Sequence, residues 1–357
     1  MGLNNQTSTS YDERKMLFLW LKQISSYTAW NRVLSYYKLW ADAAENCRRM
    51  ACATGCDDTS RVSDSDYVSI LKGFAHCEDG VLRLRSGDKR VFKFDANGDL
   101  AMADRPLTYW DKYLIRIEWG EHPPISEQDT PGWTDFHRAF VELSEAWGEI
   151  APDVLEPWNA NAESHTFYNE DLKSTLQKMR YSLPLPEVPD PENNTFVRSG
   201  RIVPCSGIWE PVEVPKPNVF SLFQQKQIPK GPFSIVGTMS YLHAESEAPN
   251  MAAYGEERGL PATWRLLWRD SRYEDGLFPD EENRYRFLMP ETRSKFERTA
   301  VSKDISDTLV WATSGQPAPR AGRWLAENDL NISIITGIGD ILPLHQGRPT
   351  RWILEVD

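Results

Sequence analysis

The hydrophobic residues in the first half of this chain recur at intervals of three and four positions, which is the spacing of amphipathic helices. Apolar stripes with this spacing predict two helices over residues 13–24 and 28–53, joined as an antiparallel hairpin. A short helix is expected at residues 67–75, and further helical stripes follow at 136–147 and 172–179. Trp and Tyr are frequent in the first two stripes, and we interpret them as part of a packed core.

A small β-hairpin is predicted within this helical half, near residues 81–102. Two short apolar runs, Val81–Leu84 and Arg90–Phe94, have the composition of strands, and Asn97-Gly98 is a favoured turn pair. The segment Asp95–Asp99 also resembles the beginning of a calcium-binding loop. Such loops close with a glutamate, and none occupies that place here, so the sequence predicts a turn without a metal ion.

Glycine and proline punctuate the second half of the chain, where short strands replace the helical stripes. Alternating prolines within residues 183–194 predict an extended linker. After it, the pairs Ser199-Gly200 and Ser206-Gly207 are typical of tight turns on either side of a short apolar run. Further strands are predicted at residues 233–242, 263–268, 285–289, 309–313, 322–325, 332–336 and 351–356.

These patterns predict an α+β protein, in which a helical N-terminal region is followed by a β-rich C-terminal region of short strands punctuated by Gly and Pro. A chain of 357 residues has room for two domains, since domains cluster at about 100–150 residues. The predicted organisation is a disordered tail at 1–10, a mainly helical domain at 11–182, the proline-rich linker at 183–194 and a β-rich domain at 195–357.

The chain carries a formal net charge of −12, which argues against nucleic acid as a direct partner and favours a basic protein partner. Its 14 tryptophans supply large apolar surfaces for a core or for an interface. No apolar run reaches the roughly 18 residues of a membrane span, and the first residues lack the apolar core of a signal peptide. The five cysteines form no regular framework. We therefore expect a cytoplasmic protein with reduced thiols and no membrane partner.

The sequence contains no specific catalytic or metal-binding constellation. Cys205 and His243 lie in the same half, but a small buried cysteine and a loop histidine are the favoured interpretation of this pair. Zinc motifs with paired Cys or His ligands are absent from the sequence. The segment Thr336–Asp340 lacks the third glycine and the following helix of a phosphate-binding loop, so a turn is predicted. We predict no cofactor, no metal, no catalytic residue and hence no enzymatic activity.

Long stretches of the chain resemble immunity proteins of bacterial polymorphic-toxin systems. The second half is similar to the family immunity protein 72 at SGRIVPCSGIWEP (199–211), GTMSYLHAESEAPNM (237–251), TWRLLWRDSRYEDG (263–276), AGRWLAENDL (321–330) and GDILPLHQGRPTRWILEV (339–356). The first half is similar to the family immunity protein 71 at RKMLFLWLKQISSYTAWNRVLSYYKLWADAA (14–44). The family pattern assigns no catalytic residues, so none is carried over.

The resemblance implies a cytoplasmic antidote that binds a cognate toxin, encoded by the adjacent gene, and blocks the toxin's active or substrate-binding surface. An acidic antidote suits a basic target, such as a nuclease delivered by a contact-dependent or type VI secretion system. Two alternatives stay open. One is an enzyme with an unrecognised site in the β-rich half, and the other is a scaffold or adaptor that uses a Trp-rich surface.

The acidic loop Asp270–Glu282 is the predicted toxin-binding surface. Its carboxylates would attract a basic partner, and its aromatic side chains would supply buried contact area. The residues assigned to this surface are Asp270, Arg272, Tyr273, Glu274, Asp275, Phe278, Asp280, Glu281 and Glu282. The alternative is a solvated acidic loop without a binding role.

Overall fold

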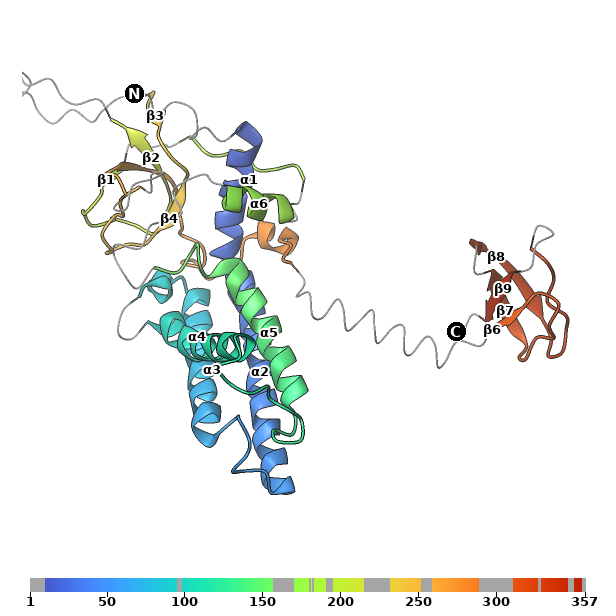
Figure 1. Ribbon diagram of the computed structural model, residues 1–357. Coiled ribbons are helices and arrows are strands. Elements are labelled where there is room, and N and C mark those ends of the chain that lie inside the picture. Colours follow the sequence, from blue (N-terminus) through green and yellow to red (C-terminus); the bar gives the residue numbers. More distant parts are fainter. Residues whose placement is uncertain are drawn as a thin grey trace, which may run out of the picture. The chain divides into compact units, whose positions relative to one another are not determined.

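The computed structural model divides into two compact units, Met1–Pro290 and Glu291–Asp357 (Figure 1). It describes residues 10–94, 98–156, 170–179, 181, 183–190, 195–214, 232–251, 259–288, 311–326, 329–345 and 350–354. The tail predicted at 1–10 lies outside the described residues except for Ser10. The proline-rich segment 183–194, predicted to separate two domains, lies inside the first unit.

Helices and strands of the first unit contribute to a common hydrophobic core, and the proline-rich segment lies within this unit. Ile208, Tyr241 and Leu267 from the sheet region belong to the same cluster of buried residues as Trp30 and Phe92 from the helical region. Burial of this common apolar surface stabilises both regions together. Helices followed by antiparallel strands make the protein α+β, which confirms the predicted fold class.

Six α-helices and a short 3-10 helix are described in the N-terminal region. They are α1 Tyr11–Ile24, α2 Tyr27–Thr54, α3 Asp64–Arg85, η1 Lys89–Phe92, α4 Asp99–Glu118, α5 Trp133–Ile150 and α6 Glu170–Lys178. Ser10, Ser26 and Ser63 cap the first three α-helices by accepting a backbone N–H with their side-chain oxygens. Figure 1 shows α2, α3 and α5 side by side and the first sheet next to α1. None of the described helices is both long and apolar enough to cross a membrane.

The hairpin predicted near 81–102 is wrong, because its first apolar run continues α3 and its second forms η1. Val81 and Leu84 extend the stripe begun by Ile70 and Cys77 along the buried face of α3. Short apolar runs are ambiguous between strand and helix, and here the helical stripe is the longer pattern. The turn at residues 95–97 lies outside the described residues.

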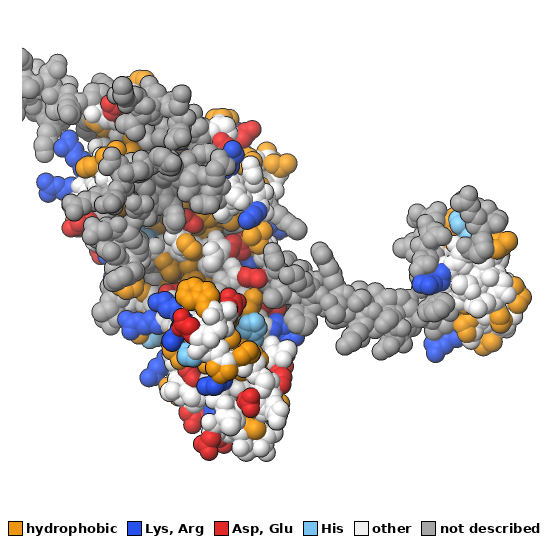
Figure 2. All heavy atoms as spheres, in the orientation of Figure 1, with side chains coloured by type: hydrophobic (Ala, Val, Ile, Leu, Met, Phe, Trp, Pro, Cys, Tyr) orange, Lys and Arg blue, Asp and Glu red, His pale blue; other side chains and the backbone are white. Residues whose placement is uncertain are grey.

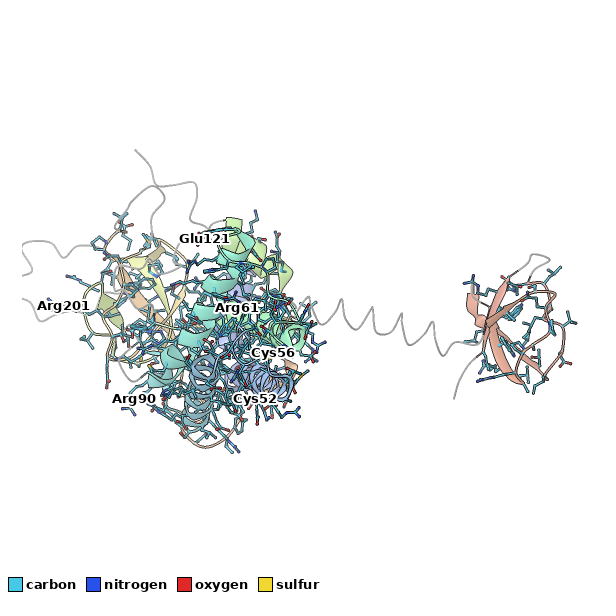
Figure 3. All side chains as sticks on the ribbon, turned by 60° about the horizontal axis from the view of Figure 1, so that its bottom comes forward. Cys52, Cys56, Arg61, Arg90, Glu121 and Arg201 are labelled. Carbon is cyan, nitrogen blue, oxygen red and sulfur yellow. The ribbon has the colours of Figure 1, made fainter. Side chains whose placement is uncertain are left out.

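The aromatic residues of α2 form the centre of the helical core. Trp30, Tyr37 and Trp40 have no exposed surface, and the Tyr37 hydroxyl donates to the backbone oxygen of Ala103 over 2.9 Å. The Trp40 ring lies 5.3 Å from that of Phe140. These residues therefore pack as a core. At the far end of α2, Figure 3 shows Cys52 and Cys56, which belong to five cysteines that are all free thiols.

The first sheet is antiparallel and has the strand order β1-β5-β2-β3, with β4 also paired to β2. Its strands are β1 Phe196–Arg198, β2 Gly207–Glu213, β3 Ser234–Ile235, β4 Ser240–Leu242 and β5 Thr263–Arg269. The strand predicted at 263–268 is confirmed by β5. The strand predicted at 233–242 is divided in two, since β3 and β4 are separated by a segment that contains Gly237. Both pair with β2, so the division produces a bend and leaves the sheet intact.

The strand predicted at 285–289 is wrong over the residues described, 285–288, which follow the 3-10 helix η3 Asp280–Arg284 without pairing to a sheet. Helix side chains bond this backbone instead. Gln23 donates to the Arg286 oxygen over 2.6 Å, and Arg32 donates to the Leu288 oxygen over 2.6 Å. Glu149 accepts the Leu288 N–H over 3.0 Å. Satisfied backbone groups of this kind have no need of a neighbouring strand.

The second unit is a four-stranded antiparallel sheet with the order β6-β9-β7-β8. Its strands are β6 Trp311–Thr313, β7 Gly322–Ala326, β8 Asp329–Thr336 and β9 Arg351–Leu354. Trp324 and Trp352 fill a small core on one face. The segment after β8 forms a turn in which the Gly337 N–H donates to the Asp340 carboxylate over 2.6 Å.

Candidate functional site

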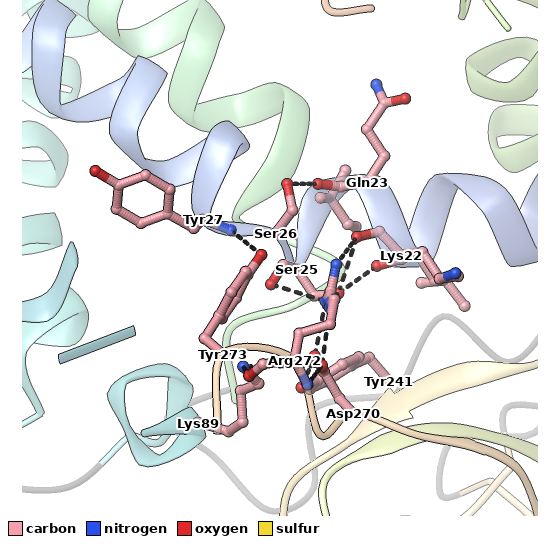
Figure 4. Close-up of polar contacts among 12 residues, drawn as sticks. Lys22, Gln23, Ser25, Ser26, Tyr27, Lys89, Tyr241, Asp270, Arg272 and Tyr273 are labelled. Carbon is pink, nitrogen blue, oxygen red and sulfur yellow. Dashed lines mark hydrogen bonds and ion pairs between the residues drawn. The ribbon is translucent and has the colours of Figure 1, made fainter. Parts of the chain in front are cut away.

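The predicted acidic loop begins where β5 ends and crosses to the junction between α1 and α2 (Figure 4). Asp270 and Arg272 are only 3% and 7% exposed, although they begin a strongly charged segment. Buried charges of this kind are found in proteins where they are paired and hydrogen-bonded. The first residues of the loop therefore belong to the interior of the unit.

Arg272 joins the sheet region to the helical region through its guanidinium group (Figure 4). It donates two hydrogen bonds to the Asp270 carboxylate, over 2.8 and 2.7 Å. It also donates to the backbone oxygen of Lys22 over 2.7 Å, and to the backbone and side-chain oxygens of Ser25 over 3.1 and 2.8 Å. These acceptors lie at the C-terminal end of α1, where helical carbonyl groups lack partners within the helix. A planar fork of donors suits this set of oxygens.

Lys89 and Tyr241 complete the surroundings of the Asp270 carboxylate. The Tyr241 hydroxyl donates to it over 2.9 Å, and the Lys89 ammonium lies 3.8 Å away while donating to the Arg272 backbone oxygen over 2.9 Å. Burial lowers the pKa of Lys89 to about 8. Burial alone would raise the pKa of Asp270, but the nearby Arg272 outweighs it and holds that pKa below its ordinary value. The carboxylate is therefore ionised at neutral pH.

Tyr273 and Glu282 hold the first turn of α2. The Tyr273 hydroxyl donates to Glu282 and accepts the Tyr27 N–H over 2.7 Å. The Glu282 carboxylate accepts from the Thr28 N–H over 3.2 Å and from the Thr28 hydroxyl over 2.7 Å. A carboxylate at a helix N-terminus is favoured by the helix dipole and by the unpaired N–H groups there. Tyr273, predicted as an anchor for a partner, is 2% exposed and packs inside the protein instead.

The loop therefore has an inward and an outward side. The inward side consists of Asp270, Arg272, Tyr273 and Glu282. The outward side consists of the exposed residues Glu274, Asp275, Leu277, Phe278 and Asp280, with Glu281 half-buried next to them. Glu281 forms an ion pair with Lys22 over 2.6 Å. Only the outward side is accessible to a partner, and its predicted role in toxin binding stays a prediction.

A second buried ion pair between sheet and helix was not anticipated from the sequence. Glu210, on β2, has a fully buried side chain and is paired with Arg265 of β5 and with Arg14 of α1, the latter over 2.7 Å. Nothing in the local pattern around Glu210 marks it as buried, because Arg14 is almost 200 positions away. Together with the Arg272 contacts, this pair fixes α1 on the sheet.

Two family models match the chain, one in the helical region and one in the region of the first sheet. Residues 8–165 match the model described as Immunity protein 71, and residues 189–286 match the one described as Immunity protein 72. Residues 8–165 therefore belong to the first of these immunity-protein families, and residues 189–286 belong to the second. This places the immunity protein in a polymorphic-toxin system, with a toxin-neutralising role and a cognate toxin as partner. No curated protein and no solved structure matches the chain.

The Arg272 network of the immunity protein joins the two matched regions. Lys22 and Ser25 lie in the immunity protein 71 region, whereas Asp270 and Arg272 lie in the immunity protein 72 region. Both matches fall within the first unit, and the strands of the second unit lie beyond residue 286. Families of this kind generally act by binding toxins. Residues on the inward side of the loop contact α1 and α2, so they connect the two family regions within the first unit.

In the immunity protein, His243 is buried and Cys205 is half-buried against hydrophobic residues of the first sheet. His243 follows β4 and contacts the Phe92 and Tyr241 rings at 6.3 and 5.4 Å. Burial lowers the pKa of His243 to about 3, and burial raises the pKa of the Cys205 thiol. Neither shift favours a thiolate with a basic imidazole beside it. Over the described ranges, no group of three His, Cys, Asp or Glu side chains is placed to hold a metal ion.

Replacing His243 with glutamine is expected to reduce the acid sensitivity of the fold. In the unfolded chain, His243 has its ordinary pKa of about 6.5 and is protonated below that pH. In the folded protein, burial lowers its pKa to about 3, so it stays neutral until the pH approaches 3. This difference in pKa has no effect on the free energy of unfolding well above pH 6.5. As the pH falls below 6.5, it lowers the free energy of unfolding by at most about 1.4 kcal/mol per pH unit. Between pH 7 and pH 5, the free energy of unfolding should fall by about 2 kcal/mol less in the variant. An equal fall in both proteins would contradict the prediction.

Proposed function

We propose that this immunity protein binds its cognate toxin directly and covers the toxin's active or substrate-binding surface. The observation that carries the proposal is the match to two immunity-protein families across residues 8–165 and 189–286. The net charge of −12 supports a basic toxin that acts in the cytoplasm, and a nuclease fits because nucleases present basic surfaces to phosphates. We propose that the toxin is encoded by the adjacent gene and delivered by a contact-dependent or type VI secretion system. Neutralisation by binding needs no catalytic residue in this chain.

Coexpression with the product of the adjacent toxin gene tests this function. We expect the two proteins to co-purify and the toxin to lose its activity in proportion to the bound immunity protein. Growth of cells that express the toxin should be restored only when the immunity protein is present. A toxin that remains fully active in the complex, or that does not bind, would overturn the proposal.

The outward side of the acidic loop is proposed to accelerate the encounter with the toxin. Changing Glu274, Asp275 and Asp280 to lysine should slow association at low salt, since exposed carboxylates steer a basic partner over a distance. The effect should shrink at high salt because screening shortens the range of these charges to about 3 Å at about 1 M salt. Association rates measured at two salt concentrations would show it. Glu281 is left unchanged because its ion pair with Lys22 also supports the fold.

A matched control separates the loop from the total charge of the protein. Asp42, Glu45 and Asp58 are exposed acidic residues in the C-terminal half of α2 or just beyond it. Changing these three to lysine alters the net charge by the same amount at the far end of a 28-residue helix. We expect a smaller reduction of the association rate. Equal reductions in both triple variants would remove the loop from the interface.

A further inference from the structure

An exposed aromatic surface lies where α4 ends and α5 begins. Ring contacts link Tyr109 to Tyr113, Tyr113 to His122 and Trp133 to His137. Together with the exposed Trp119, which directly follows α4, these residues are called the α4–α5 aromatic surface below. Trp119 is 73% exposed and Tyr109 is 55% exposed. Of the tryptophans whose side chains the structure describes, Trp119 alone has such exposure. Hydrophobic, histidine and charged side chains lie together over α4 and α5 in Figure 2.

The rings of this surface rest on a buried base and on each other. Trp110 is 1% exposed and contacts Phe136 with ring centres 4.8 Å apart, which anchors α4 to α5. Above this base, Tyr109 and Tyr113 are stacked with an angle of 9° between their rings. The Tyr113 ring lies 5.3 Å from His122. Side chains that are held before a partner arrives lose less conformational entropy on binding.

The surroundings of the aromatic rings are acidic. Residues 104–138, which span the whole surface, contain seven Asp and Glu against four Lys and Arg, a net charge of −3 over 35 positions. Arg116 is already paired with Glu121, which Figure 3 labels, over 2.7 Å. Asp111 and Glu118 are exposed and have no ion pair among the described residues. The surface therefore combines aromatic faces with a small net negative charge.

We propose that the α4–α5 aromatic surface is a docking site for a Lys- and Arg-rich face of the cognate toxin. This inference rests on the proposed function and names the part of the protein that supplies binding energy. Cationic side chains are attracted both to the acidic residues and to the faces of Tyr and Trp rings. Exposed Tyr and Trp are also the residues that most often dominate binding energy. A second copy of this chain would bring like charges together, and so would nucleic acid.

Alanine substitution at the two most exposed rings tests the docking site. Tyr109→Ala with Trp119→Ala should weaken binding of the purified, inactivated product of the adjacent toxin gene by about 30-fold or more, mainly through faster dissociation. The unfolding temperature should change little because both side chains are exposed. Tyr11→Ala is the control, since Tyr11 is an aromatic residue 66% exposed at the start of α1. It should retain wild-type affinity.

The outcomes distinguish this site from the proposed function. Wild-type affinity in the folded double variant would overturn the docking site while leaving toxin binding intact. A wild-type protein that does not bind the toxin would overturn the function itself, and the docking site with it. If the wild type forms a dimer that the double variant abolishes while toxin binding is unaffected, the surface is an interface between copies and the proposal is wrong.

Discussion

Replacing Arg272 with methionine is expected to lower the free energy of unfolding by about 3–5 kcal/mol, which is the usual cost of removing one partner from a buried ion pair. The substitution leaves the Asp270 carboxylate buried without its two charge-assisted hydrogen bonds. It also removes the Arg272 hydrogen bonds to the carbonyl groups of Lys22 and Ser25 at the end of α1. Urea unfolding of the full chain, followed by tryptophan fluorescence, would measure the loss.

Two further variants make this expectation specific. Arg269 directly precedes the loop but is exposed, and its nearest carboxylate, Glu274, is 3.7 Å away. Arg269→Met should therefore change stability by less than about 1 kcal/mol. Adding Asp270→Asn to Arg272→Met should recover part of the loss, because it removes the unpaired buried charge. A loss at Arg272 no larger than that at Arg269 would show that the buried network does not hold the two family regions together.

Replacing Gly207 with alanine is expected to destabilise the first sheet by about 2–5 kcal/mol, because steric overlap and backbone strain act together. Gly207 pairs with Leu242 on one side and Arg269 on the other, at φ +155°. A Cβ atom there would lie 2.1 Å from the Trp268 backbone oxygen. That oxygen belongs to β5 and cannot turn aside as a flexible side chain could. Thermal unfolding should show the loss as a markedly lower transition temperature.

Gly200 provides the matched control for Gly207 within the same turn-rich stretch. Its φ is +73°, and a Cβ atom there would meet nothing within 4 Å. Gly200→Ala should therefore lower the free energy of unfolding by only about 1–2 kcal/mol, which is the cost of placing an alanine in the left-handed backbone conformation. If both variants lose the same stability, the close approach of β2 to β5 at Gly207 does not contribute to the loss, and the prediction is wrong.

Periodic patterns predicted the elements whose burial follows from their own residues. The stripes at 13–24 and 28–53 and the alternation at 263–268 specify α1, α2 and β5, because each has one face to bury. The hairpin near 81–102 was predicted wrongly because a four-residue run with three apolar side chains does not distinguish a strand from the last turns of a long helix.

Contacts between distant residues limited what could be predicted of the site. The acidic composition of Asp270–Glu282 indicated an exposed segment, yet the structure buries its Asp270, Arg272 and Glu282. The partners of Arg272 and Glu282 in the helices lie about 250 positions earlier in the chain, so no local pattern relates them. The α4–α5 aromatic surface was missed for a similar reason. Trp119 directly follows the last residue of α4, where helical periodicity no longer predicts whether a side chain is buried or exposed.

The contacts of Arg272 also constrain how a gene for such a protein can recombine. A crossover between residues 165 and 189 would join an immunity protein 71 region to an immunity protein 72 region from a diverged copy. The guanidinium group would then meet an α1–α2 turn that had not been selected with it. It would keep Asp270, but a residue other than serine at position 25 would remove one of its buried acceptors. Such a hybrid would be less stable and would supply its cell with less folded antidote. Exchange beyond residue 290 leaves this network intact, so heritable variation should accumulate in the C-terminal unit first.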